Sequence, residues 1–232
     1  MADKEIGILD HLEELRYRFI IIISALFITT CISYFFAYKI LSFIKIPAGN
    51  IILVYLSPFE PFMIRLKIAL FSGIMLSLPI ILYQTLAFLV PGLKKNEKRT
   101  LFLILFVFIV LFIMGAYFSF VFLLPISLKW LFAQANGYLT SNIRADYYIM
   151  FVGWFVLISG LVFETPLLII SLLKLKICTY KSLRKQWQII YIGILVASAI
   201  LTPDWNPITM LLMAIPILFL YEASLLIGRL LA

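Results

Sequence analysis

The sequence predicts an all-α membrane protein with six transmembrane helices. Of its 232 residues, 64% are hydrophobic and only 13% are charged, and the mean hydropathy is +1.12. This balance is typical of a protein with several membrane spans. Spanning a hydrocarbon core of about 30 Å takes roughly 20 helical residues, and six apolar runs reach or approach that length. These runs must be helices, because lipid cannot hydrogen-bond to an open backbone and no strand-like alternation is present.

The six runs follow one another along the whole chain. The fifth run has 15 residues, so it gives about 22 Å of helix and calls for local thinning of the bilayer. Prolines 79, 166 and 216 interrupt three runs, and such prolines are either tolerated or curve the bundle into a concave shape. No internal repeat or low-complexity segment separates the runs, so a single domain over 1–232 is predicted. The runs are 19–38, 68–90, 101–125, 149–173, 187–201 and 208–227.

The distribution of basic residues predicts that both termini are cytoplasmic. With the N-terminus inside, the inner segments carry thirteen Lys and Arg residues and the outer segments carry six. Lysine and arginine are enriched on the cytoplasmic side of membrane proteins, so the net charge of +8 reports topology rather than binding to nucleic acid. The outer segments 39–62 and 127–148 mix apolar and polar residues, which favours structured caps. The six outer basic residues are Lys39, Lys45, Arg65, Lys67, Lys129 and Arg144.

The sequence offers no catalytic or cofactor-binding constellation. His11 is the single histidine, and Cys31 and Cys178 are far apart, so neither a metal site nor a disulfide framework is predicted. There is no glycine-rich phosphate-binding loop with a lysine. The N-terminus lacks a small-residue cleavage site before its first apolar run, which argues against a removable signal peptide. We expect no enzymatic activity and no cofactor.

Glu164 lies in the apolar sequence GLVFETPLLI, close to the middle of the fourth run. A charge at the bilayer midplane costs on the order of 3 kcal/mol, so the acid needs an explanation. The structural explanation is that Pro166 deprives the carbonyl of Val162 of its usual donor, and a protonated Glu164 would serve such an acceptor. The functional explanation is a polar point on a groove that is kept for a partner or substrate segment.

The first 18 residues form an acidic segment on the basic side of the protein. Glu14 and Arg18 are four residues apart, so an ion pair within one helix is expected. A carboxylate here could instead bind an arginine-bearing peptide, because Arg–carboxylate pairs are bidentate and charge-assisted. Four apolar residues share one face, as in an amphipathic helix that lies on the membrane surface. These are Ile8, Leu12, Leu15 and Phe19.

Three further acids have simple local explanations. Glu97, in GLKKNEKRT, reads by itself as an ordinary solvated charge among basic neighbours. Asp204, in LTPDWNP, sits in a tight outer turn where Asp and Pro are common. Glu60 lies between Pro58 and Pro61 and is placed to start the second spanning helix.

Seven motifs in order resemble the TatC family, the multi-span receptor of the twin-arginine protein translocase. Each motif alone is weak, but seven in register across six spans cover essentially the whole chain and are specific. They are HLEELRYR (11–18), LSPFEPF (56–62), LPIILYQ (78–84), NEKR (96–99), FETP (163–166), LTPD (201–204) and AIPILFLYE (214–222).

The resemblance implies a cup- or glove-shaped bundle with short last helices and a receptor for folded proteins that carry twin-arginine signal peptides. Glu14 and Glu97 would bind the arginine pair, with Arg16 helping to shape the site. Glu164 would face the concave side, where the signal peptide and single-span TatA or TatB partners dock. The proton gradient would supply energy, and self-association in a receptor complex is expected. Pro58, Glu60 and Asp204 would shape the outer rim.

The same resemblance sets the expected location and the alternatives. A bacterial plasma membrane or a plastid thylakoid membrane is expected. The sequence departs from the family at DWNPITM, which has no Gln after the acid and runs about two residues longer, so the role of that rim stays open. A proton-coupled small-solute transporter is the rival interpretation, although such proteins usually show repeated halves. An accessory subunit of a larger membrane complex overlaps with the favoured interpretation.

Overall fold

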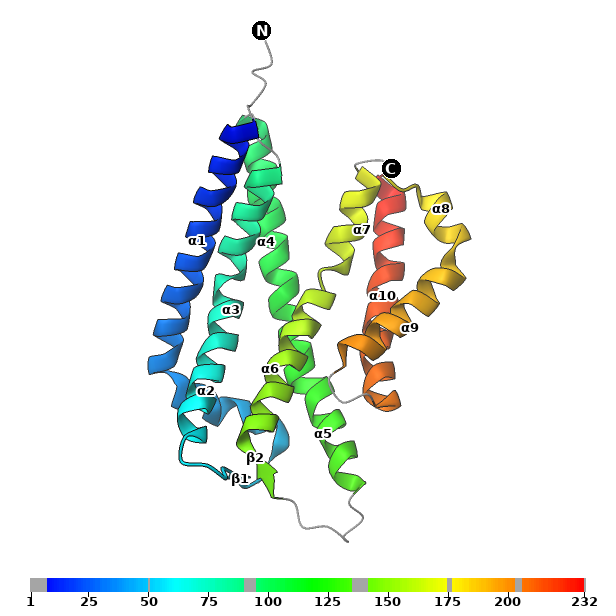
Figure 1. Ribbon diagram of the computed structural model, residues 1–232. Coiled ribbons are helices and arrows are strands. Elements are labelled where there is room, and N and C mark those ends of the chain that lie inside the picture. The colour runs from blue at the N-terminus through cyan, green and yellow to red at the C-terminus, as the bar shows by residue number, and fades with distance from the viewer. Residues whose placement is uncertain are drawn as a thin grey trace.

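The computed structural model describes residues 8–49, 51–89, 95–134, 142–174, 177–202 and 206–231, and it is almost entirely helical (Figure 1). The helices are α1 (Ile8–Phe35), α2 (Ala37–Ile44), a 3₁₀ turn η1 (Ile46–Ala48), α3 (Glu60–Leu89), α4 (Lys95–Phe118), a π turn η2 (Ser119–Leu123), α5 (Leu124–Ala133), α6 (Ala145–Val162), α7 (Thr165–Lys174), α8 (Tyr180–Lys185), α9 (Trp187–Leu201) and α10 (Pro207–Leu231). The strands β1 (Leu53–Val54) and β2 (Ile143–Arg144) pair in parallel.

Five helical stretches in the described part of the chain are long and apolar enough to cross a membrane, and α9 is a shorter apolar helix. Large apolar side chains cover the outside of the molecule. Phe35 is 82% exposed and Ile200 is 75% exposed, an arrangement suited to lipid rather than water. This confirms an all-helical membrane protein. The five stretches are Leu12–Phe35, Glu60–Phe88, Phe102–Ala133, Ala145–Leu173 and Pro207–Arg229.

The start of α1 and the end of α10 lie at the same end of the bundle, whereas α2, β1 and β2 lie at the opposite end (Figure 1). α1 packs along α3, and α6 packs against both α3 and α4. α7, α9 and α10 form a second group beside them. α9 and the start of α10 stop well short of the lower end of α5 (Figure 1).

The first helix differs from the sequence prediction. α1 is one continuous helix of 28 residues, so its first part does not form a separate amphipathic helix lying on the membrane. The physical reason is local: the chain from Ile8 to Phe35 contains neither Gly nor Pro, so nothing interrupts the backbone ladder.

Segments 39–62 and 127–148, predicted as structured caps, carry regular structure in their described residues, and residues 135–141 lie outside these. The first cap contains α2, η1 and β1, and the second ends in β2. Leu53 is paired with Ile143 and Val54 with Arg144, so two segments about 90 residues apart in sequence are tied together. α3 begins at Glu60, eight residues before the predicted run, and this confirms Glu60 as a helix start.

The third and fourth runs are each divided. α4 passes through the π turn η2 into α5, whose first turn holds Pro125. A π turn absorbs the proline that a regular ladder would exclude. The fourth run breaks at Phe163 and Glu164, between α6 and α7. α9 spans Trp187–Leu201, the predicted fifth run, and α10 begins one residue before the sixth.

Two apolar clusters hold the bundle together. The larger one lies where α3, α5, α6 and the first half of α10 meet, and it includes the fully buried Phe155 and Leu124. The smaller one joins α7 to the second half of α10 around Tyr221. At that end Arg184 Nη1 donates to both carboxylate oxygens of Glu222, at 2.8 and 2.9 Å, and ties α8 to α10.

Candidate functional site

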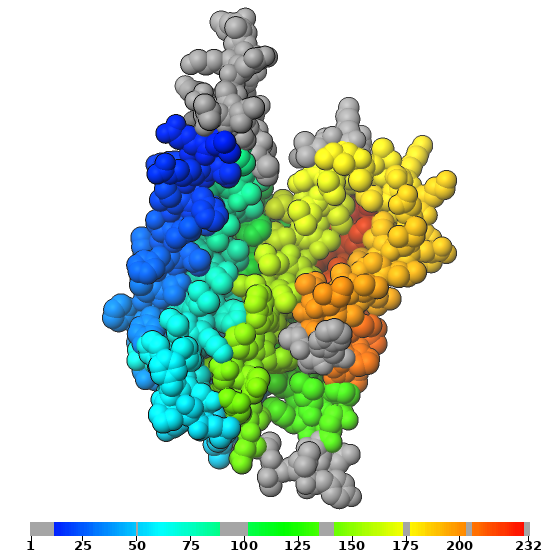
Figure 2. All heavy atoms as spheres, in the orientation of Figure 1, coloured from blue at the N-terminus to red at the C-terminus, as the bar shows by residue number. Residues whose placement is uncertain are grey.

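A notch opens at the end of the molecule where α1 begins and α10 ends (Figure 2). α1, α3 and α4 lie on one side of the notch, and α7 lies on the other (Figures 1 and 2). The predicted site residues Glu14 and Glu97 belong to α1 and α4, near this end. Glu164 directly precedes α7. Glu14 and Glu97 are therefore carried by helices that begin or end at this end of the bundle, and Glu164 lies at the break between α6 and α7.

Glu14 sits in a small polar network between α1 and α3. Arg18 Nε donates to Glu14 Oε1 at 2.9 Å, and Nη2 of the same guanidinium also contacts that oxygen. Arg18 Nη1 donates to Gln84 Oε1, near the end of α3, at 3.1 Å. The expected pair at four-residue spacing is therefore confirmed. Gln84, which sequence reasoning did not assign to the site, links the pair to α3.

Glu14 keeps capacity for a second cation. Its side chain is 29% exposed, and among the described residues both contacts that Arg18 makes with Glu14 go to Oε1. A carboxylate offers about four acceptor positions on its two oxygens. The second oxygen is thus available to a guanidinium that arrives from the notch.

The other two residues of the predicted arginine-binding site are placed differently. Glu97 lies in the first turn of α4, where the helix dipole favours a negative charge. Its side chain lies outside the described residues. Arg16 is exposed and is two positions from Glu14, which is about 200° around the helix. The structure therefore does not bring Arg16 and Glu14 together.

Glu164 is a buried carboxylate with no hydrogen-bond partner in the described part of the chain. It is 5% exposed, and neither of its carboxylate oxygens has a hydrogen-bond partner among the residues that the structure describes. The structural explanation given by the sequence is wrong. Thr165 Oγ1, not Glu164, donates to the carbonyl of Val162, at 2.5 Å. A Thr next to an acid before a proline is the signal that would have identified this donor.

The break that positions Glu164 is packed tightly against α4. Phe163 lies 5.6 Å from Phe118, ring centre to ring centre. At Gly115 a Cβ atom would be 2.7 Å from Phe163 Cβ and 2.8 Å from the carbonyl oxygen of Ser159. Gly115 thus allows α4 to approach the end of α6 closely. Glycine inside an apolar membrane helix is the sequence signal for such a close contact, and Gly115 was not singled out from the sequence.

The outer rim is held by two ion pairs between α3 and the second cap. Glu60 Oε2 accepts from the backbone N–H of Leu56 at 2.8 Å, and its Oε1 is bound by Arg144. Lys67 Nζ contacts Asp146 Oδ1. Pro58 is exposed beside this network. Asp204, the remaining predicted rim residue, lies outside the described residues.

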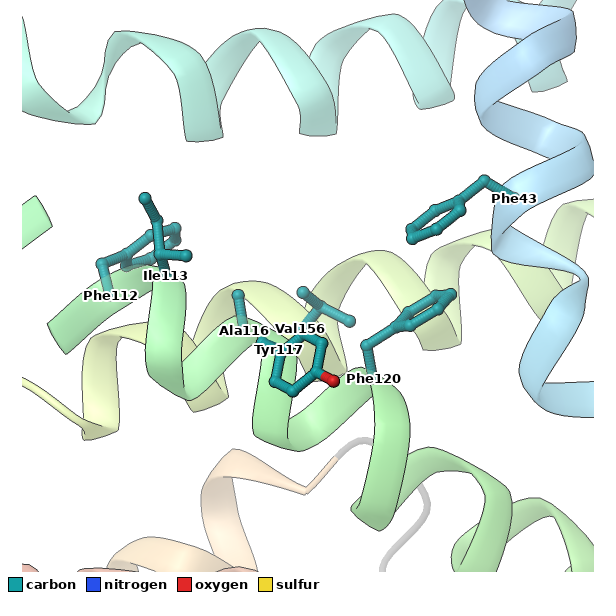
Figure 3. Close-up of a pocket in the computed structure, with 7 residues that line it drawn as sticks. All are labelled: Phe43, Phe112, Ile113, Ala116, Tyr117, Phe120 and Val156. Atoms are coloured by element: carbon teal, nitrogen blue, oxygen red, sulfur yellow. The ribbon is translucent and has the colours of Figure 1, made fainter. Parts of the chain in front are cut away.

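An apolar pocket of about 240 Å³ lies between α2, α4 and α6 (Figure 3). Phe43 of α2 stacks on Phe120 of η2, with ring centres 4.5 Å apart and planes 3° from parallel. The phenol oxygen of Tyr117 is the polar side-chain atom drawn among the lining residues. Such a pocket suits an aliphatic or aromatic side chain, not a charged group. The lining residues are Phe43, Phe112, Ile113, Ala116, Tyr117, Phe120 and Val156.

Comparisons with known proteins agree on one family. A family model described as Sec-independent protein translocase protein (TatC) matches residues 10–216. The TatC protein of Aquifex aeolicus is 37% identical over 227 residues, which cover 95% of this chain and 94% of that protein. An uncharacterized tatC-like protein of Gracilaria tenuistipitata var. liui is 34% identical, with 98% and 95% covered.

A solved structure is similar over the same extent. The crystal structure of the twin-arginine translocase receptor TatC superposes with a TM-score of 0.80 at 37% identity. The superposition covers 95% of this chain and 98% of that one.

Proposed function

Since the chain belongs to the TatC family of Sec-independent protein translocase proteins, we propose that it is a receptor for twin-arginine signal peptides. In this proposal Glu14 and Glu97 bind the two guanidinium groups of the peptide, and Arg16 tunes the charge around them. The apolar part of the peptide then enters the notch. The small-solute transporter considered from the sequence finds no support in these similarities.

The half-buried carboxylate of Glu14, near the start of α1, carries the proposal. It is already bound by one guanidinium, that of Arg18, which shows that its surroundings accept this geometry. An arginine of the peptide would use the remaining oxygen or displace Arg18. Arginine suits the site better than lysine, because its planar fork matches a carboxylate with two parallel hydrogen bonds.

Binding of a twin-arginine peptide to the purified full chain tests the role of Glu14. Glu14→Gln should weaken binding by roughly tenfold, the effect expected from losing a charge-assisted hydrogen bond. The wild-type chain should prefer the arginine pair to a lysine pair. Crosslinking from positions 14 and 97 to the same peptides gives an independent readout of proximity.

Glu13→Gln is the matched control for Glu14→Gln. Glu13 is the neighbouring acid of the same helix and is exposed, with no ion pair in the described part of the chain. The Glu13→Gln variant has the same change of net charge as Glu14→Gln, and it should bind the peptide as the wild type does. Equal binding by the Glu14 and Glu13 variants would exclude a specific role for Glu14.

For Glu164 we propose docking of a single-span partner of the TatA or TatB kind. The observation is its pair of buried, unpartnered oxygens at the base of α7. A hydrogen-bond donor on a partner helix would satisfy an acceptor that costs free energy while it is alone. The partner would thereby bind more tightly to the chain with Glu164 than to one without it.

Crosslinking of a single-span partner to the chain in membranes tests the role of Glu164. Glu164→Ala should reduce the crosslinked fraction about fivefold or more, a loss of about 1 kcal/mol, as for an interhelical hydrogen bond. Glu164→Gln keeps the acceptor oxygen and should retain most of the crosslink. Unchanged crosslinking in Glu164→Ala would exclude this docking site.

The remaining proposals concern the orientation of the chain, its membrane, its self-association and the energy source for transport. The N-terminus and C-terminus are cytoplasmic, the chain resides in a bacterial plasma membrane or a thylakoid membrane, and it self-associates in a receptor complex. The proton gradient drives transport. The sequence contains no nucleotide-binding loop, so the energy has to come from such a gradient or from another protein.

A further inference from the structure

Arg65 has no carboxylate partner among the described residues, and it lies at the end of the bundle where α2 and the strands are found (Figure 1). It is in the second turn of α3, close to the start of the membrane-crossing stretch Glu60–Phe88. Two other cations at this end are paired: Lys67 binds Asp146, and Arg144 binds Glu60. Among the described residues, no ion pair and no hydrogen bond is made by the Arg65 guanidinium.

Two aromatic rings hold this guanidinium in place. Its central carbon is 4.4 Å from the ring centre of Tyr34, in the last turns of α1, and 4.6 Å from that of Tyr38 in α2. Nε of Arg65 is buried and has no hydrogen-bond partner in the described chain. The two rings therefore hold the guanidinium in place, while its N–H groups donate no hydrogen bond within the described chain. Cation–π contacts stabilise the charge, but they do not satisfy hydrogen-bond donors.

The surroundings of Arg65 are those of a lipid interface rather than of an aqueous pocket. Tyr38 is 62% exposed, and the apolar Phe35 and Leu66 beside these residues in sequence are 82% and 42% exposed. Aromatic side chains with a polar tip gather where headgroups meet the hydrocarbon. A ligand of Arg65 would thus touch a charged point and an apolar surface together.

We propose that Arg65, stacked between Tyr34 and Tyr38, binds the phosphodiester of an anionic phospholipid headgroup. A guanidinium fork matches phosphate oxygens with two parallel hydrogen bonds. The acyl chains of the same lipid cover the exposed apolar residues, which a soluble anion cannot do. With the orientation proposed above, this lipid belongs to the leaflet that faces away from the cytoplasm.

Lipid binding to the purified full chain in neutral detergent tests the proposal without any signal peptide. Native mass spectrometry gives the bound fraction of phosphatidylglycerol and of zwitterionic phosphatidylcholine. The wild type should prefer phosphatidylglycerol. Arg65→Gln should weaken its binding about tenfold, the loss expected for a bidentate charge-assisted contact. Arg65→Lys keeps the charge without the fork and should lose less.

Lys129→Gln is the matched control. Lys129 is an exposed cation of α5 at the same end of the bundle, without an ion pair in the described part of the chain. The Lys129→Gln variant loses one positive charge, as Arg65→Gln does, and it should bind phosphatidylglycerol as the wild type does. Tyr38→Leu leaves Arg65 in place but removes one ring, and should weaken binding severalfold. Circular dichroism and gel filtration verify that each variant is folded.

Three results would overturn the proposal. The first is equal binding of phosphatidylglycerol by wild type and folded Arg65→Gln. The second is displacement of the lipid by equimolar soluble glycerol phosphate, which would identify a site for a free anion. The third is self-association in lipid-free detergent that is lost in Arg65→Gln, because the ligand would then be a carboxylate of a second copy.

Discussion

At the scale of single residues, Glu14 and Glu164 are two carboxylates in opposite environments. Glu14 is half-buried at an open end of the molecule and shares one oxygen with Arg18. Glu164 is buried between α6 and α7, with both oxygens unpartnered in the described chain. A paired, accessible carboxylate can exchange one guanidinium for another at little cost, whereas a buried acceptor without a donor gains most from a new partner. These environments support an arginine site at Glu14 and a docking site at Glu164.

The contact of Arg18 shows which part of the first site is readable from sequence. Its pairing with Glu14 follows from four-residue spacing on one helix and was predicted. Its hydrogen bond to Gln84 joins residues 66 positions apart. That bond depends on the packing of α1 along α3, which no local pattern specifies.

Gly115 gives a stability prediction at the same scale. Gly115→Ala should lower the free energy of unfolding by about 1–3 kcal/mol, because the added Cβ overlaps Phe163 and the Ser159 carbonyl. Denaturation of the purified protein in mixed detergent micelles measures the difference. The loss should include weaker packing of α4 on the α6–α7 break.

Gly193→Ala is the control for this overlap. Gly193 lies in α9, and a Cβ there would meet nothing within 4 Å. Alanine also favours a helix over glycine by about 1 kcal/mol, so this variant should be as stable as the wild type or more so. A Gly115 variant that is equally stable would disprove the close approach of α4.

At the scale of elements, the break between α6 and α7 is the feature that sequence predicted only in part. Pro166 indicated a kink in the fourth run, and the helix does break there, at Phe163 and Glu164. The predicted donor to the carbonyl of Val162 was wrong. Thr165 is that donor because its hydroxyl reaches back three residues, whereas the Glu164 oxygens make no hydrogen bond in the described chain.

Thr165→Val should therefore destabilise the protein by about 1–3 kcal/mol, the cost of leaving the part-buried carbonyl of Val162 without this donor. Thr165→Ser keeps the hydroxyl and should retain most of the stability. The measurement is again denaturation in mixed micelles.

A second threonine provides the comparison. Thr85 Oγ1 donates to the carbonyl of Ile81 inside the regular helix α3, where the backbone already supplies a donor. Thr85→Val should change stability by less than about 0.5 kcal/mol. Equal effects of the two valine variants would contradict the special role of Thr165.

At the scale of the whole molecule, the two ends of the described chain lie on one side of the bundle (Figure 1). The even number of crossings that the sequence predicts would place both ends on one side, and that number stays a prediction. The short helix α9 matters here, because about 22 Å of helix is less than the hydrocarbon thickness and implies a thinner bilayer beside α9 and α10.

Cysteine labelling from each side of the membrane tests the orientation. In a cysteine-free background, Lys185→Cys at the end of α8 should react with an impermeant maleimide in inverted vesicles, and Lys129→Cys in α5 should react in right-side-out vesicles. Both side chains are exposed. The opposite labelling pattern would reverse the proposed topology and move Glu14 away from the cytoplasm.

The sequence by itself determined the helical membrane class, the order of the apolar helices and even the bounds of α9, because crossing a bilayer depends on length and hydropathy along one dimension. It also located the acids of the candidate site and the family. Only the tertiary structure decided which charges have partners. Lys67 and Asp146 are 79 positions apart and Arg144 and Glu60 are 84 apart, so their pairing, and the absence of a carboxylate beside Arg65 in the described chain, follow from how the helices and caps pack. Distance along the chain carries no information about such contacts.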